Sequence, residues 1–414
     1  TNLQGGTLFS CPAMNRSSFA SMRLIPLITC VISSLVALPG IAQYQPGFQS
    51  EEARDMAMLC NTHTFIDLYG SGEKMIPEGY ERVYSSVATP LDNKFEIFKK
   101  GDLAVIEIRG STASMMSWMV NVHSSMIPAK GRIIVNGKKF DYEFAEDTSA
   151  AVHSGFALAV ATIAEEVVAQ IKELHKSGVH DVIITGHSQG GALAHLLRAY
   201  LEHLPGRKLA KDTNFKTYAF AAPMVGDKAF AQEYERNYCT KLSSFSIVNP
   251  GDPIPKMPVA YKEGSVFSMQ NIMAMITGGE SVKSNVKNAL LNIFSGSMEK
   301  VTGAADVSIA KRVEGALGEV EMPAYRKEWN FEPMATKLEV GPFPYPQSLA
   351  DAAAKEQATG EGLNDDKVES DLEQLKKEPS FFQHKPYNYY VAVLERYFPA
   401  EYNALEVKVL PENL

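Results

Sequence analysis

Hydrophobic positions along the chain fall into two patterns that alternate through much of its length. The β-branched run at 182–184 is typical of a strand buried on both faces of a parallel sheet, and further extended segments are predicted at 95–98, 103–108, 217–220 and 245–248. Longer stretches with apolar residues at helical spacing lie at 50–60, 156–174 and 192–200. Strand, helix and strand in succession predict an α/β fold with a mostly parallel central sheet flanked by helices.

Two further stretches have patterns of their own. Residues 132–144 predict a β-hairpin, because Asn136-Gly137 favours a two-residue turn between extended segments. Residues 113–126 carry four methionines and few charges, a pattern as consistent with core packing as with a flexible apolar contact surface.

The composition indicates a globular protein. The chain has 414 residues, of which 45% are hydrophobic and 21% charged, enough for one large domain or a domain with an insertion. Its net charge of -8, without a basic block interleaved with aromatic residues, argues against a nucleic-acid-binding surface. The sequence carries no signal for an oligomeric state.

The first 42 residues are predicted to be an upstream extension followed by a signal peptide. Arg16 and Arg23 precede the apolar run 24–38, and small residues follow it, so cleavage is expected after Ala42. Lipid attachment at Cys30 and an uncleaved membrane anchor are the alternatives, since the run is just short of a ~20-residue span. Secretion or export to the periplasm is the favoured interpretation, with no stable membrane span in the mature chain.

Two cysteines remain after that cleavage, Cys60 and Cys239. An exported protein could join them in a disulfide, and two buried free thiols fit the sequence almost as well. Neither cysteine lies in a metal-ligand pattern.

The strongest chemical signal is the pentapeptide Gly186-His187-Ser188-Gln189-Gly190, between the strand at 182–184 and the helix at 192–200. A sharp strand-to-helix turn that exposes a serine requires small residues two before and two after it, and glycine stands at both places. Ser188 is therefore the candidate nucleophile of a nucleophile elbow.

Several separated motifs share their order with one known family. They are I-R-G-S at 108–111 followed by S-W-M-V-N at 117–121, V-H-S-G-F at 152–156, T-Y-A-F-A-A-P-M-V-G-D at 217–227 and N-P-G-D-P-I-P at 249–255. With the elbow, they resemble the class 3 lipases, the family of the fungal triacylglycerol lipases, over roughly 95–260 and 381–395. Met224 and Asp227 stand where the family usually has arginine and asparagine. The resemblance implies an α/β-hydrolase fold.

The resemblance also assigns roles upstream of the elbow. Ser111 would donate its backbone N–H to the oxyanion together with that of Gln189, and Arg109 would hold the loop in place. The Met-rich residues 113–126 would include a lid, with core packing as the alternative.

The triad acid is assigned to Asp252 by its motif, with Asp227 as the runner-up, since both follow predicted strands. In this fold the triad follows the chain order Ser, Asp, His, and His384 is the only histidine after Asp252. His384 is therefore the candidate base, whereas His153 precedes the nucleophile and is interpreted as structural.

The interval between Asp252 and His384 is much longer than in the family. Residues 262–380 are expected to be a largely helical insertion that either caps the active site or lies elsewhere, between a core at 43–261 and a C-terminal part of the core at 381–414.

These observations predict a secreted serine ester hydrolase, a lipase or carboxylesterase, that acts on acylglycerols or related esters at a lipid-water interface. No metal or organic cofactor is implied. A phospholipase and a short-chain or aryl esterase with the same triad remain open, as does a lipase-like binding protein without catalysis.

Overall fold

The structure is a computed structural model that describes residues 45–63, 72–112, 114–257, 313–326, 330–334, 337–346 and 382–410. The predicted signal peptide at 1–42 lies outside the described residues. So does most of the expected insertion at 262–380.

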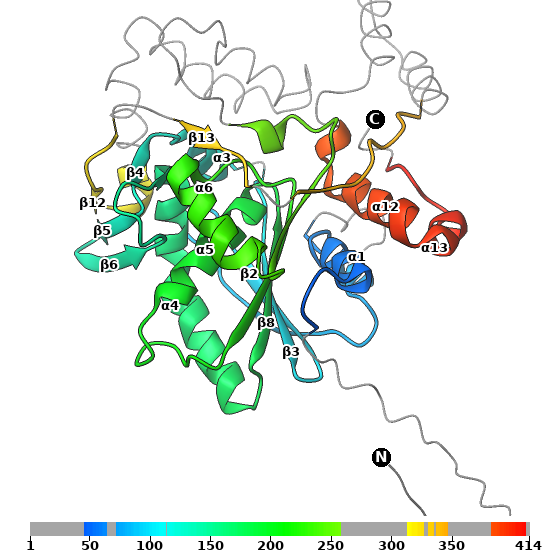
Figure 1. Ribbon diagram of the computed structural model, residues 1–414, viewed down its shortest axis with the longest axis horizontal. Coiled ribbons are helices and arrows are strands. Elements are labelled where there is room, and N and C mark those ends of the chain that lie inside the picture. Colours follow the sequence, from blue (N-terminus) through cyan, green and yellow to red (C-terminus); the bar gives the residue numbers. More distant parts are fainter. Residues whose placement is uncertain are drawn as a thin grey trace, which may run out of the picture. The chain divides into compact units, whose positions relative to one another are not determined.

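A seven-stranded sheet forms the centre of the fold, in the order β1-β2-β3-β8-β9-β11-β14 (Figure 1). Its strands are β1 (Glu81–Ser85), β2 (Phe95–Lys100), β3 (Leu103–Ile108), β8 (Asp181–His187), β9 (Asn214–Phe220), β11 (Ser244–Val248) and β14 (Lys337–Glu339). The strands from β3 to β14 are parallel, while β1 and β2 run antiparallel at one edge. The predicted mostly parallel sheet of an α/β-hydrolase is confirmed.

Helices cover both faces of this sheet (Figure 1). One face carries α4 (Ser154–Lys176), α5 (Gln189–His203) and α6 (Lys228–Tyr234), and the other carries α1 (Ser50–Leu59), α12 (Pro386–Tyr397) and α13 (Pro399–Ala404). The alternating strands send apolar side chains to both faces, so the protein has one hydrophobic core against α4 and α5 and another against α1 and α12.

Two small sheets flank this core. One has the order β13-β10-β7-β4, and the other is the predicted hairpin with a third strand, β12-β5-β6. Asn136 and Gly137 have φ angles of 49° and 73°, as a type I′ turn requires, which confirms the hairpin. The strands are β4 (Met126–Pro128), β5 (Lys130–Val135), β6 (Lys138–Glu143), β7 (Ala151–His153), β10 (Gly226–Asp227), β12 (Val320–Glu321) and β13 (Phe331–Glu332).

Part of the segment expected to be an insertion belongs to the core sheets. β14 pairs in parallel with β11, β13 pairs with β10, and β12 pairs with β5. The described residues of 262–380 therefore complete the central sheet and both small sheets, and the expected boundary at 262 does not separate core from insertion.

Cys60 and Cys239 are both buried. Cys60 lies in the hydrophobic core beside α1 and α12, and Cys239 lies in the core on the opposite face of the sheet. The central sheet thus separates the two sulfur atoms, and the fold leaves no path for a disulfide between them.

Of the described helices, α4 alone is long and apolar enough to cross a membrane. Its most apolar window is 67% buried inside the protein, and its buried face packs in the core against α5. These are the features of a core helix.

Two buried histidines make the stability of the fold sensitive to acid. Burial lowers the pKa of His153 to about 3 and that of His195 to about 3, from an ordinary value of 6.5. Below pH 6.5 these two histidines are protonated in the unfolded chain but remain neutral in the folded protein. The free energy of unfolding therefore falls as the pH drops toward 3, by about 1.4 kcal/mol per pH unit for each histidine. We expect His195→Gln to flatten this dependence between pH 6 and 4 in urea unfolding, and an unchanged slope would contradict the assignment.

Candidate active site

Ser188 lies at a sharp turn between β8 and α5. Its backbone has φ 56° and ψ -125°, a conformation that costs a non-glycine residue on the order of 1–3 kcal/mol. Two backbone hydrogen bonds hold it there, one from the Ser188 N–H to the Phe220 carbonyl at 2.9 Å and one from Ala192 N–H to the Ser188 carbonyl at 3.1 Å. The elbow predicted from the pentapeptide has this geometry.

The two glycines of the pentapeptide are required by close backbone contacts. A Cβ atom on Gly186 would lie 2.4 Å from the Gly190 carbonyl carbon, and one on Gly190 would lie 2.0 Å from the Ile108 oxygen. Both contacts involve backbone, which cannot move aside as a flexible side chain would. The turn can therefore form only with glycine at both positions.

We expect Gly190→Ala to destabilise the protein by about 3 kcal/mol or more, because β3 and α5 must separate to admit the methyl group. Gly315→Ala is the matched control, since its Cβ would meet no atom within 4 Å. Urea unfolding of both variants measures the difference. Equal stability of the two variants would show that the elbow tolerates the methyl group.

His384 joins Ser188 to Asp252 in a chain of hydrogen bonds. Its Nε2 lies 2.9 Å from the Ser188 Oγ, and its Nδ1 lies 2.8 Å from Asp252 Oδ2. The structure thus brings together three residues that were predicted as site residues from separate parts of the sequence. Asp252 is fully buried, while the His384 side chain remains 12% exposed and accessible to a substrate.

The loop after β11 and the short helix η4 (Phe382–His384) are fastened to each other. Asn249 donates from Nδ2 to Gln383 Oε1 at 2.6 Å, and Gln383 donates in turn to the Phe343 carbonyl at 2.8 Å. These bonds fix the acid-bearing loop against the base-bearing helix.

Asp252 is held in its ionised form. Burial opposes ionisation, but the charge and hydrogen bond of His384, with bonds from the Ile254 N–H and the Tyr389 hydroxyl, hold the pKa of Asp252 below its ordinary value. Burial and the Asp252 carboxylate raise the pKa of Tyr389 well above its usual range, so the phenol keeps its proton and donates to Asp252 at 2.7 Å.

His187 packs against the candidate base. Its ring centroid lies 4.8 Å from that of His384, and burial together with His384 lowers the pKa of His187 well below its ordinary value. A neutral imidazole at this position places no positive charge beside the His384 ring.

The two candidate oxyanion donors, Ser111 and Gln189, are linked through one side chain. Asn121 donates from Nδ2 to Ser111 Oγ at 2.8 Å and accepts from Gln189 Nε2 at 3.0 Å. Gln189 is the first residue of α5, where a backbone N–H has no partner within the helix and remains able to bind an anion. Asn121 therefore couples the position of the 111 loop to the start of α5.

Arg109 secures the other side of this loop. It donates from Nη2 to the carbonyl of Asp92 at 2.8 Å and to its carboxylate at 2.7 Å, and Thr112 Oγ1 also donates to the Asp92 carboxylate. Arg109 thus has the loop-holding place that the resemblance assigned to it.

Two residues weighed as alternatives lie in other roles. His153 is fully buried, caps α4 by accepting from the Phe156 N–H at 3.3 Å and stacks on the Phe156 ring. Asp227 caps α6 by accepting from the Phe230 N–H at 3.0 Å. Both side chains are engaged with backbone, as the structural interpretation of His153 expected.

The Met-rich segment forms α3 (Met115–Val122), and its described side chains pack in two ways. Met119 and Val120 are buried in the core, whereas Met116 and Trp118 are partly exposed. The predicted lid is thus anchored by part of one face, and core packing accounts for that face only.

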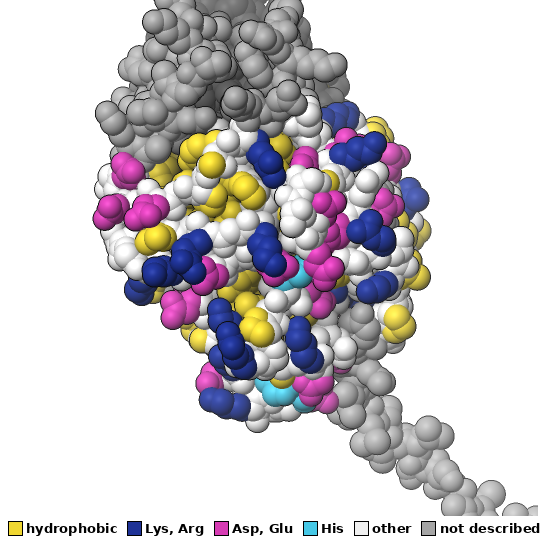
Figure 2. Space-filling model, turned by 60° about the vertical axis from the view of Figure 1, so that its left-hand side comes forward, with side chains coloured by type: hydrophobic (Ala, Val, Ile, Leu, Met, Phe, Trp, Pro, Cys, Tyr) yellow, Lys and Arg dark blue, Asp and Glu magenta, His cyan; other side chains and the backbone are white. Residues whose placement is uncertain are grey.

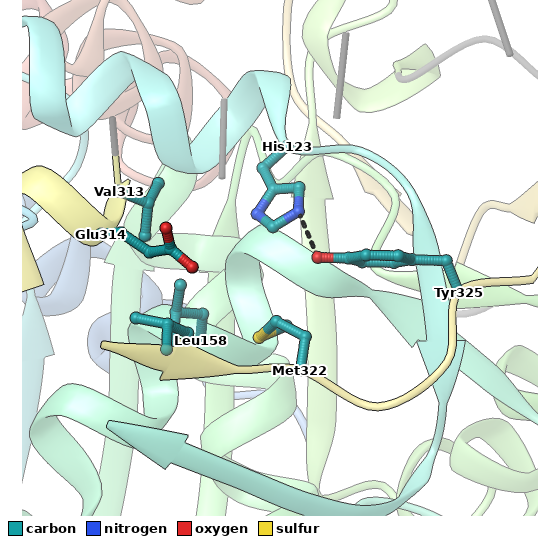
Figure 3. Close-up of a pocket in the computed structure, with 7 residues that line it drawn as sticks. His123, Leu158, Val313, Glu314, Met322 and Tyr325 are labelled. Carbon is teal, nitrogen blue, oxygen red and sulfur yellow. Dashed lines mark hydrogen bonds between the residues drawn. The ribbon is translucent and has the colours of Figure 1, made fainter. Parts of the chain in front are cut away.

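A cavity of about 220 Å³ lies beside the C-terminal end of α3 (Figure 3). His123 and Glu314 point into it, and His123 Nε2 lies 3.1 Å from the Tyr325 hydroxyl. Apolar side chains form the rest of the lining, namely Leu158, Val313, Val320 and Met322. Residues 313–326 therefore contribute most of the lining of this cavity.

Sequence reasoning gave no role to Asn121 and Tyr389. Asn121 stands in the S-W-M-V-N motif, and Tyr389 is one of the aromatic residues just after His384. Both motifs contribute to the resemblance described above, but spacing along the chain does not reveal a hydrogen bond to Ser111 or to Asp252.

Comparison with known proteins identifies the central part of the chain. Residues 105–262 match the family described as lipase (class 3). This segment is similar in sequence to the class 3 lipases. It includes Ser111, Ser188, Gln189 and Asp252, while His384 lies beyond its end.

Individual lipases resemble the chain over part of its length. A secreted mono- and diacylglycerol lipase, LIP4 of Malassezia restricta, is 27% identical over 193 residues, which make up 46% of this chain and 56% of that protein. Lipase ZK262.3 of Caenorhabditis elegans is 34% identical over 84 residues, 20% of this chain and 22% of that protein. The triacylglyceride lipase of Rhizomucor miehei is 20% identical, with a TM-score of 0.39 over 52% of this chain and 77% of that one. The chain spans about half the length of the Malassezia lipase, and less of the nematode one.

Proposed function

We propose that this protein is a serine ester hydrolase that cleaves acylglycerols or related carboxylic esters. The hydrogen-bonded chain from Ser188 through His384 to Asp252 is the observation that carries the proposal. Its members come from the carboxyl ends of two parallel strands and from η4, the edge of an α/β sheet where active sites form.

In the proposed mechanism, Ser188 Oγ attacks the ester carbonyl carbon while its proton passes to His384 Nε2. Asp252 holds the imidazole by its Nδ1 and stabilises the imidazolium that forms. The backbone N–H groups of Ser111 and Gln189 donate to the oxyanion of the tetrahedral intermediate.

The intermediate collapses when the bond to the alcohol breaks and His384 returns the proton to the leaving oxygen. Water then attacks the acyl-enzyme on Ser188, again with His384 as base, and the carboxylic acid leaves. The steps are balanced without a metal or organic cofactor.

A fluorophosphonate probe tests the nucleophile directly. We expect one covalent adduct on Ser188 in the folded protein, detected by mass spectrometry, and no adduct in Ser188→Ala. Absence of the adduct in folded wild-type protein would favour a lipase-like binding protein without catalysis.

The proposed substrate is an acylglycerol at a lipid-water interface, as the names of the matched relatives suggest. Figure 2 shows hydrophobic side chains gathered near the upper end of one face, whereas charged side chains of both signs cover much of the rest. Such an apolar area favours contact with lipid.

Rates on emulsified and dissolved esters separate the alternatives. A jump in rate above the solubility limit of a triacylglycerol supports a lipase. Equal rates on dissolved short-chain esters favour an esterase, and preference for phosphatidylcholine vesicles favours a phospholipase.

Secretion or export to the periplasm is part of the proposal. It rests on the predicted signal peptide and on relatives that are named as secreted. A mature protein that begins at Gln43 is the expected result of N-terminal sequencing, and retention of residues 24–38 would indicate an anchor instead.

A further inference from the structure

A cluster of two histidines and one aspartate lies at the opposite ends of the strands from Ser188. Among the described residues, His175, His180 and Asp212 are grouped so that one potential ligand atom from each lies within 4.8 Å of the others. Figure 2 shows histidine side chains beside acidic ones at the lower end of the face that it presents.

The end of α4 builds the first half of the cluster. The helix closes in a Schellman motif, in which Val179 N–H donates to the Leu174 carbonyl and Gly178 N–H to the His175 carbonyl, each at 3.0 Å. Gly178 has φ 84°, which reverses the chain and brings His180 back beside His175. The two imidazole rings consequently lie 4.2 Å apart in an edge-to-face arrangement.

The start of β9 supplies the second half. Asn214 donates from its backbone N–H to the His180 carbonyl and from Nδ2 to the Asp181 carboxylate, each at 2.8 Å. This pairing fixes the preceding loop, which carries Asp212, against the end of α4. The three candidate ligands thus stand on hydrogen-bonded backbone from two separate connections.

The distances within the cluster suit a small tetrahedral cation. Asp212 Oδ2 lies 3.3 Å from His180 Nδ1, and Asp212 Oδ1 lies 3.7 Å from His175 Nε2. Ligand atoms about 2.0 Å from a tetrahedral Zn²⁺ lie about 3.3 Å from one another. Each of the two histidine nitrogens thus has a carboxylate oxygen of Asp212 within 3.7 Å, and the Asp212 side chain is 64% exposed.

We propose that His175, His180 and Asp212 bind Zn²⁺, with water completing the tetrahedron. Two imidazoles and one carboxylate are ligands that zinc takes readily, whereas Ca²⁺ and Mg²⁺ prefer sites made wholly of oxygen. The metal ties the α4–β8 turn to the α5–β9 loop. It takes no part in ester hydrolysis, because the seven residues of β8 place the site roughly 25 Å from Ser188.

Calorimetric titration of the full chain with ZnCl₂ tests the proposal. We expect one saturable site whose affinity falls at least about tenfold in His180→Ala and in Asp212→Asn. His203→Ala is the matched control, since His203 lies outside the cluster on α5 and its Nδ1 bonds the Ala199 carbonyl at 2.7 Å. It should bind zinc as the wild type does.

Thermal unfolding supplies a second readout that does not depend on activity. Zinc should raise the Tm of the wild type and of His203→Ala but not that of the two cluster variants, because a ligand stabilises only the state that binds it. Their far-UV circular dichroism should match that of the wild type, since the His180 side chain is 41% exposed and that of Asp212 is 64% exposed. Unchanged zinc affinity in folded His180→Ala, or no saturable binding in the wild type, would overturn the proposal.

Discussion

Alanine in place of Ser188 is expected to lower kcat for ester hydrolysis by about 10⁶-fold, because the variant has no nucleophile on which the acyl group can rest. The fold should survive, since the Ser188 side chain has one bond, to His384, and the elbow is held by backbone bonds from Ala192 and to Phe220. Initial rates on a chromogenic ester, corrected for contaminating esterase, measure the loss.

Ser246→Ala is the matched control for this change. Ser246 is a buried serine whose hydroxyl likewise bonds a histidine, His195, at 3.2 Å, but it lies in β11 away from the elbow. It should retain wild-type kcat within about threefold, as expected when a neutral side-chain hydrogen bond outside the site is removed. Comparable losses in both variants would mean that general destabilisation explains the effect of Ser188→Ala.

Asparagine in place of Asp252 is expected to reduce kcat by about 10⁴-fold. The amide removes the negative charge that stabilises the imidazolium, and it can donate to His384 Nδ1 and so turn Nε2 away from its role as base. Asp252 is fully buried, so solvent cannot supply the missing charge. The pH-rate profile and kcat of the purified variant measure this effect.

Tyr389→Phe distinguishes the contribution of the Asp252 charge to catalysis from that of one hydrogen bond to its carboxylate. This variant removes one bond to the carboxylate and leaves those from His384 and Ile254, so kcat should fall by only about tenfold. The loss of a bond to the ionised form raises the pKa of Asp252, and kcat of the purified variant measures the effect on catalysis. If Asp252→Asn cost no more than Tyr389→Phe, Asp252 would not be the triad acid.

The elements that carry the proposed chemistry could be predicted because each has a local requirement. The turn at Ser188 demands glycine at both flanking positions, and a buried parallel strand demands an apolar run such as that at 182–184. The motif shared with the class 3 lipases then assigned Asp252, and chain order selected His384. The structure places these side chains within hydrogen-bonding distance across 132 and 196 residues of sequence.

The contacts that orient the site were not predictable by the same means. Asn121 bridges Ser111 and Gln189, and Tyr389 reaches Asp252, only because separate elements pack together. The sequence around a polar residue on a helix does not indicate which residue of another element it will hydrogen-bond.

β14 was missed for a different reason. Lys337–Glu339 is a three-residue edge strand with two exposed charged side chains, so neither an apolar run nor a clear alternation marks it. Its place is determined by the open edge of β11, whose own apolar pattern was recognised.

The packing of α1 against α12 links any activity of this protein to the order in which the chain emerges during synthesis. Asn61, just after α1, donates from Nδ2 to the Pro386 carbonyl at 3.2 Å, two residues after His384. Ser188 and α1 are therefore synthesised well before the segment that carries His384 and α12. The proposed triad can therefore be completed only after the segment that carries His384 and α12 has been synthesised and has packed against α1.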